Sequence, residues 1–178
     1  MLFITGQRLG ETRMMKWEYV HDGIWTIPEK LTKANREHKL PLPPLAQQIL
    51  KDLRIYTGGS QYVFQSPAKE NQPITWIQWH ARSIRDTGDE KGVSDFRIHD
   101  LRRTVATYMT GMGINRTVLG KVLNHKQLAG DSHVTARYDR YDYMKEKKTA
   151  LLQWGTRLQA ILSDTEAGTA SATIHKMY

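Results

Sequence analysis

Three short runs typical of β-strands lie within residues 15–43, and most of the remaining chain has helical periodicity. The runs MKWEYV and IWTIP are rich in aromatic and β-branched residues, and the HDG between them is a hairpin signal. A third run, HKLPLP, follows the polar segment EKLTKANRE, which is typical of a long turn. We therefore expect a small antiparallel three-stranded sheet in a mostly helical α+β domain.

Helices are predicted where apolar residues recur at helical spacing between start and stop signals. The expected helices span about residues 9–15, 43–56, 74–88, 99–111, 115–124, 132–140 and 143–162. Within the third of these, Trp76, Trp79 and Ile84 share one face, which favours core packing over stacking on bases. The residues YVFQS at 62–66 read as a short extended piece.

The length of 178 residues suits one domain, which we place at residues 1–162. Residues 163–178 read as a polar, weakly structured tail. The opening MLFITG resembles the end of an apolar helix that runs into a turn, with no start signal before it. We therefore expect that an N-terminal part of a longer protein is absent.

Charge and composition narrow the possible partners and cofactors. Basic residues outnumber acidic ones by 26 to 18, for a net charge of +8, which favours a polyanion such as nucleic acid. The absence of cysteine excludes disulfides, cysteine nucleophiles and thiolate metal sites, and fits a reducing compartment. No apolar run approaches the roughly 20 residues of a membrane span. Without a His-Glu-x-x-His motif or a phosphate-binding loop, we expect no metal and no cofactor.

Some charged residues occur in patterns that suit phosphate chemistry, although each has an ordinary explanation. Arg8 follows a glycine turn at a helix start, where anions are favoured, and Glu11 is placed to hold its guanidinium. A surface pair within one helix has the same spacing. His99 and Arg102 share a helix face and suit one phosphate, but a solvated helix face has that pattern too.

The second hairpin turn and the histidines leave similar alternatives. The basic residues of that turn are Lys33, Arg36 and Lys39. They suit either a cationic tip that enters a DNA groove or a solubilising turn. The histidines show no metal-ligand pairing and otherwise read as surface or helix-end residues; they lie at positions 21, 38, 80, 99, 125, 133 and 175.

The order of these motifs is more informative than any one of them. TGQRLGE, a lysine in a β-turn, HDLRRT, LNHK and a tyrosine in ARYDRYDY follow one another over residues 3–160. In this order they resemble the catalytic domain of the tyrosine recombinase (phage integrase) family. The resemblance implies that fold and a set of site residues. The implied catalytic residues are Arg8, Lys33, His99, Arg102, His125 and the nucleophile Tyr138, with Glu11 supporting Arg8.

Two features depart from the usual family pattern. The Leu-Gly-His of the family is Leu123-Asn124-His125 here, and asparagine tolerates a left-handed backbone well, so we expect the turn to be kept. The gap between His125 and the tyrosine is long and resembles that of integrases from integrative islands and related phages.

Three tyrosines cluster in ARYDRYDYMKEKK, and each alone is most simply a half-buried packing residue. By the resemblance, the pattern AxYDR followed by Tyr, Glu-Lys and Ala-Leu selects Tyr138 as the nucleophile over Tyr141 and Tyr143.

The resemblance also implies a function. The chain would be a site-specific recombinase that cuts and rejoins double-stranded DNA through a 3′-phosphotyrosyl intermediate, without metal or ATP. It would integrate or excise a phage or genomic island, a mobile genetic element. The implied partners are a tetramer of protomers on synapsed DNA sites and an accessory DNA-bending protein. The implied location is the bacterial cytoplasm, at the nucleoid when DNA-bound, with no membrane partner.

Two other functions remain open. The segment TVATYMTGMGINRTVLGKVLNH has a helix, a glycine turn and a helix, as in a non-catalytic helix-turn-helix module that binds DNA. That interpretation leaves Arg8, Lys33 and Tyr138 unexplained. A type IB topoisomerase-like enzyme would use similar chemistry to relax DNA.

Overall fold

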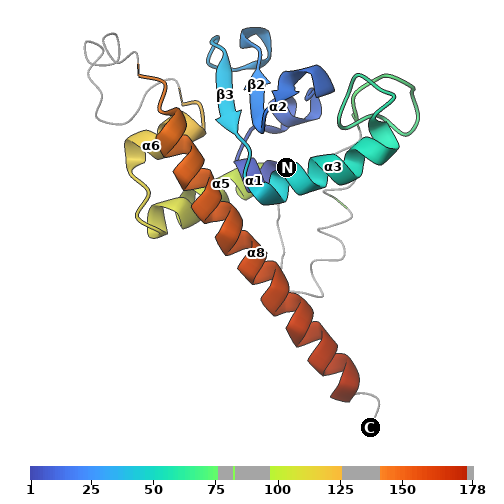
Figure 1. The fold of residues 1–178 in the computed structure, drawn as a ribbon, viewed down its shortest axis with the longest axis vertical. Helices are drawn as coiled ribbons and strands as arrows, with labels where there is room; N and C mark the ends of the chain where they lie inside the picture. Colours follow the sequence, from blue (N-terminus) through green and yellow to red (C-terminus); the bar gives the residue numbers. More distant parts are fainter. Residues whose placement is uncertain (76–81, 83–96, 126–140, 176–178) are drawn as a thin grey trace.

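The computed structural model describes residues 1–75, 82, 97–125 and 141–175 (Figure 1). Its helices are α1 (Leu2–Thr5), α2 (Leu9–Arg13), α3 (Pro44–Thr57), α5 (Ile98–Gly111), α6 (Arg116–Val122) and α8 (Met144–His175). Figure 1 shows α8 crossing the other elements, and it contacts α1, α3, α5, α6 and β3 (His38–Pro41). None of the described helices is long and apolar enough to cross a membrane.

The small sheet is confirmed. Strands β1 (Val20–His21), β2 (Ile24–Ile27) and β3 pair antiparallel in the order β1-β2-β3. The predicted HDG turn joins the first two strands, with left-handed backbone at Asp22 (φ 51°) and Gly23 (φ 71°). Positive φ at two successive turn residues matches the twist of a tight hairpin.

The first strand is shorter than its sequence run indicates, because Trp17–Tyr19 form a 3₁₀ turn. The Trp17 backbone N–H donates to Gln61 O (3.0 Å), and its indole N–H donates to Thr57 O (3.0 Å). The Arg54 guanidinium lies over the same ring. This aromatic residue therefore packs on the end of α3 rather than extending the sheet.

The predicted helices at 9–15, 43–56, 99–111 and 115–124 are present with bounds shifted by a few residues. Those at 74–88 and 132–140 fall largely outside the described residues, as do Trp76, Trp79 and Ile84. The extended piece at 62–66 makes two isolated bridges, Lys16 to Tyr62 and Gln65 to Pro73.

The C-terminal segment corrects one prediction. The helix expected at 143–162 continues in α8 to His175, so residues 163–175 are helical rather than weakly structured. The polar composition of this segment was wrongly interpreted as a lack of secondary structure. A helix already nucleated by packed turns extends cheaply through alanine and other good helix formers.

The core lies between the inner face of the sheet and helices α5, α6 and α8. Trp25, Ile27 and Leu40 are fully buried on β2 and β3. The helices contribute buried Val105, Met109, Val122, Leu151 and Trp154. This core fixes the sheet against α5 and the end of α6.

Gly6 sets how closely α1 approaches the other helices. It ends α1 with φ 65°, and a Cβ there would lie 2.8 Å from Leu123 Cδ2 and 3.2 Å from Val105 Cγ1. Any side chain would therefore push the segment before Arg8 away from α5 and α6. Glycine brings the Gly6 carbonyl within reach of an α5 side chain.

Candidate active site

Arg8 lies at the N-terminal cap of α2, as its position after the glycine turn predicts. The Glu11 carboxylate accepts hydrogen bonds from the Arg8 backbone N–H (3.1 Å) and from Nη1 of its guanidinium (3.0 Å). Glu11 is only 2% exposed, so this is a partly buried, charge-assisted pair rather than a solvated one. The expected contact between the two residues is present, and it fixes the direction of the Arg8 side chain.

Arg102 projects from α5 into the junction of three segments. Its Nη1 donates to Gly6 O (2.7 Å), and its Nη2 donates to Leu123 O. Burial, followed by the nearby positive charge of Arg8, lowers the Arg102 pKa to about 10, while Glu11 opposes the shift. The guanidinium therefore stays charged at neutral pH and holds the end of α1 against the end of α6.

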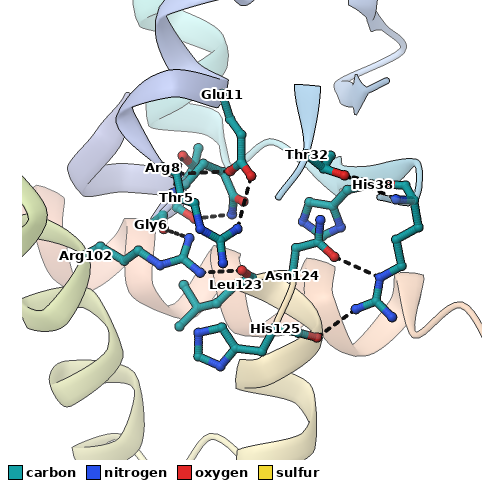
Figure 2. A network of polar contacts seen from close by, with 12 residues as sticks. Thr5, Gly6, Arg8, Glu11, Thr32, His38, Arg102, Leu123, Asn124 and His125 are labelled. Carbon is teal, nitrogen blue, oxygen red and sulfur yellow. Dashed lines mark hydrogen bonds and ion pairs between the residues drawn. The ribbon is translucent and has the colours of Figure 1, made fainter. Parts of the chain in front are cut away.

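His125 follows α6, and its backbone N–H donates to Gly120 O (3.0 Å). Burial lowers its pKa, and the charges of Arg102 and Arg8 lower it further. Figure 2 shows the two guanidinium groups next to each other, with His125 beside Leu123. Three segments distant in sequence thus bring two arginines and a histidine together, and the lowered pKa favours an imidazole able to accept a proton.

The predicted left-handed turn before this histidine is confirmed, since Asn124 has φ 49°. Asn124 is only 1% exposed, so it takes the place of the family's glycine inside the packed structure.

His99 is exposed in the first turn of α5, one turn before Arg102. The two residues line a small cavity of ≈ 130 Å³, together with Gln7 and others. The predicted shared face of His99 and Arg102 is therefore real and borders this cavity.

Lys33 lies in the turn between the 3₁₀ helix Glu29–Leu31 and β3, and its side chain is exposed. Within the described residues, no hydrogen bond or ion pair joins it to Arg8, Arg102 or His125. Tyr138 is outside the described residues. The structure thus brings Arg8, Glu11, Arg102 and His125 together, with His99 beside Arg102. The catalytic roles of all seven predicted residues stay proposals.

His38 was interpreted from sequence as a surface or helix-end residue, and this is wrong. It is 5% exposed, and its Nε2 donates to Val122 O (3.1 Å) at the end of α6. The alternation of side chains along β3 could have predicted this burial, because His38 and buried Leu40 are two residues apart and share a face.

Gln7 is a second residue near the site that sequence reasoning missed. Its Nε2 donates to Thr5 O and to Val122 O, both at 2.9 Å, so it ties the end of α1 to α6 beside Arg102. Gln7 lies between two short helices, so no helical or strand periodicity predicted that this polar side chain is buried.

Acid is expected to destabilise the fold through His38. Burial, then the positive charge of Lys147, lowers the His38 pKa to about 3, against about 6.5 in an unfolded chain. The unfolded state therefore binds the extra proton between these values, and the free energy of unfolding rises with pH across that window. Its fall from pH 7 to pH 5 should include about 2 kcal/mol from this residue.

Urea unfolding of His38→Gln at pH 7 and pH 5 checks this contribution. Glutamine does not titrate and keeps a donor for Val122 O, so its stability should change less between the two pH values. An equally steep change in the variant and the unchanged chain would contradict the assignment.

The sequence profile of the Phage integrase family matches residues 1–144. The chain belongs to the phage integrase family. This integrase-family chain is 25% identical over 160 residues to prophage integrase IntA of Escherichia coli strain K12, covering 88% of the chain and 37% of that protein. It is 26% identical over 142 residues to tyrosine recombinase XerA of Pyrococcus furiosus, covering 78% of the chain and 49% of that protein. It therefore spans less than half the length of either relative.

Solved structures confirm the fold of this phage integrase family member. A crystal structure of XerA recombinase superimposes with a TM-score of 0.59 at 20% identity, covering 79% of this chain and 57% of that one. XerH site-specific recombinase, bound to palindromic difH substrate in a post-cleavage complex, gives a TM-score of 0.56 at 17% identity, covering 78% and 40%. The expected tyrosine recombinase catalytic-domain fold is thus confirmed.

Proposed function

We propose that this chain is the catalytic part of a site-specific DNA recombinase that cuts and rejoins double-stranded DNA through a 3′-phosphotyrosyl intermediate. The observation that carries the proposal is the convergence of Arg8, Arg102 and His125, with the Arg8 guanidinium held by buried Glu11. Fixed cations placed before the reaction stabilise negative charge that develops on phosphoryl oxygens.

The proposed reaction begins when the Tyr138 hydroxyl oxygen attacks the scissile phosphorus. A bond forms between that oxygen and phosphorus, and the bond from phosphorus to the 5′-oxygen of the next nucleotide breaks. The product is a 3′-phosphotyrosyl ester and a free 5′-hydroxyl. Because one phosphoester replaces another, rejoining can run in reverse without ATP.

Two proton transfers accompany this exchange. Free tyrosine has a pKa of about 10, so its hydroxyl must lose a proton during attack. His125, with its lowered pKa, is suited to receive that proton. The leaving 5′-oxygen needs a proton in return, and by family resemblance Lys33 supplies it.

Arg102 and His99 complete the proposed phosphate site. Arg102 uses two hydrogens on carbonyl groups, and a guanidinium has five, so it retains donors for a phosphoryl oxygen. His99 borders the same small cavity as Arg102 and is assigned to phosphate binding beside it.

A helix-turn-helix module is the weaker interpretation. The helices α5 and α6 exist as that interpretation expects, with Gly113 in the left-handed region between them. However, that interpretation explains neither the partly buried Arg8–Glu11 pair nor the placement of Arg102 beside Arg8. The names of the relatives, prophage integrase and tyrosine recombinase, favour recombination over topoisomerase activity.

The wider biological role follows from the same likeness and is also a proposal. The chain would act on a phage or genomic island in bacterial cytoplasm, as one of four protomers on synapsed sites with an accessory DNA-bending protein. In support of the DNA partner, XerH in the similar structure is described as bound to its difH substrate.

The proposal is tested by incubating this chain with supercoiled plasmid in EDTA, without ATP, and stopping the reaction with detergent. Low salt is needed, since binding through basic residues weakens steeply as salt rises. We expect nicked plasmid that carries covalently attached protein. Plasmid that shifts in a native gel but never carries attached protein would favour the binding module instead.

A further inference from the structure

The turn that carries Lys33 is closed by its own hydrogen bonds. The Thr32 hydroxyl donates to Arg36 O (2.8 Å) and accepts from the Arg36 backbone N–H (3.2 Å). Asn35 has φ 53°, a left-handed conformation that lets the chain reverse within this short span. Thr32 is buried, while Lys33 is exposed. Lys33 therefore sits on a preformed loop whose position depends on what holds that loop against the protein.

The Arg36 side chain provides such a contact. Its Nε donates to Asn124 Oδ1 (2.9 Å), and its Nη2 donates to His125 O (2.8 Å). Figure 2 draws both bonds as dashed lines ending on Asn124 and His125. The planar fork of a guanidinium matches two neighbouring acceptors in a way that a lysine ammonium does not. Arg36 is thus not only a cationic tip, because its side chain joins two loops 88 residues apart in sequence.

The other side of this contact is anchored independently. Leu123 O accepts from Arg102, and the His125 backbone N–H donates to Gly120 O. Asn124 is buried, and its left-handed backbone presents the side-chain oxygen to Arg36. A glycine at position 124 would offer no side-chain acceptor. The Asn124–His125 turn is therefore the fixed support, and the Lys33 turn is attached to it.

We propose that Arg36 is a positioning residue that holds the Lys33 turn against the Asn124–His125 turn, so that Lys33 can protonate the leaving 5′-oxygen. This inference rests on the proposed function. Arg36 would not contact the reacting atoms, and its loss would act through Lys33. Removing it should therefore mimic, in weaker form, the loss of the lysine.

The test separates leaving-group protonation from the rest of catalysis. The plasmid position nicked by the wild-type chain is copied into two synthetic duplexes, one with the natural 5′-bridging oxygen and one with sulfur there. A thiol has a pKa of about 8.5, so sulfur leaves as a thiolate without needing a proton. A defect in proton donation should disappear on the sulfur duplex.

On the oxygen duplex we expect Lys33→Ala to cleave about 10²-fold or more slowly, as for loss of a general acid. Arg36→Ala should be about 10- to 100-fold slower, as for a misplaced catalytic group. Both variants should come within a few-fold of wild type on the sulfur duplex. Lys30→Ala, which removes an exposed charge just before the same turn, is the matched control and should cleave both duplexes normally.

Thermal unfolding shows whether each variant is folded. If Arg36→Ala is not folded, Arg36→Lys takes its place. Lysine keeps the positive charge but has a single donor nitrogen instead of the fork that bonds Asn124 and His125. It should show the same oxygen-specific defect at smaller size. Equal slowing on the two duplexes, or no slowing of a folded Arg36 variant, would overturn the positioning role while leaving the proposed function intact. A wild-type chain that nicks neither the plasmid nor the duplexes would contradict the proposed function and this inference together.

Discussion

Replacing Tyr138 with phenylalanine should abolish covalent attachment of the protein to plasmid while leaving DNA affinity nearly unchanged. The change deletes one hydroxyl oxygen, which is the atom proposed to attack phosphorus, and preserves the ring and the charge of the chain. Attachment is measured as plasmid-linked protein after detergent, and affinity as the midpoint of a gel shift at fixed low salt.

Two neighbouring tyrosines provide matched controls for this variant. The Tyr141 hydroxyl donates to the Glu146 carboxylate (3.2 Å), which raises the Tyr141 pKa and makes this hydroxyl harder to deprotonate. The ring of Tyr143 packs at 4.8 Å from that of Tyr141, with the Lys121 ammonium 4.5 Å from its centroid. Tyr141→Phe and Tyr143→Phe should therefore still form the adduct. Loss of the adduct in Tyr141→Phe, with its survival in Tyr138→Phe, would contradict the choice of nucleophile.

The second large effect is expected for Arg102→Ala, which should slow cleavage by about 10²- to 10³-fold, as for removal of one fixed transition-state donor. It should also lower the free energy of unfolding by roughly 2–4 kcal/mol, because Gly6 O and Leu123 O lose a charged donor in a buried setting. Urea unfolding measures the stability, and plasmid nicking well below the melting temperature measures the rate.

The adjacent residue separates these effects from a simple loss of charge. Arg103→Ala removes an arginine from the same helix, but that side chain is 76% exposed and its pair with Asp100 is a 3.4 Å surface contact. Such pairs contribute about 0–1 kcal/mol, so Arg103→Ala should be close to wild type in stability. A folded Arg102→Ala protein that cleaves within threefold of wild type would exclude Arg102 from the proposed phosphate site.

Local sequence rules predicted the parts of this molecule that local physics determines. The HDG turn fixed the hairpin because Asp22 and Gly23 readily take positive φ. Spacing along one helical turn placed Glu11 where it can reach Arg8, and the same rule put His99 and Arg102 on one face. The tolerance of asparagine for left-handed backbone predicted the conformation of Asn124.

Contacts between distant segments were not predictable in this way. Arg36 lies in a basic turn that sequence alone could not distinguish from a solubilising turn. Only the packing of β3 against the end of α6 brings its side chain to Asn124. Alternation along β3 places His38 on the same face as Leu40, but only the contact with Val122 O shows what covers that face. The order of motifs along the chain identified the cluster as a set, but not the arginine that joins two of its loops.

The central claim is most directly tested by finding which residue carries DNA after cleavage. Adducts formed by this chain on plasmid would be digested with nuclease and protease, and the nucleotide-bearing peptide sequenced by mass spectrometry. We predict a nucleotide joined through its 3′-phosphate to Tyr138, with a free 5′-hydroxyl on the other side of the break. A nucleotide on a different residue, a linkage through a 5′-phosphate, or DNA binding without any adduct would contradict the proposed mechanism.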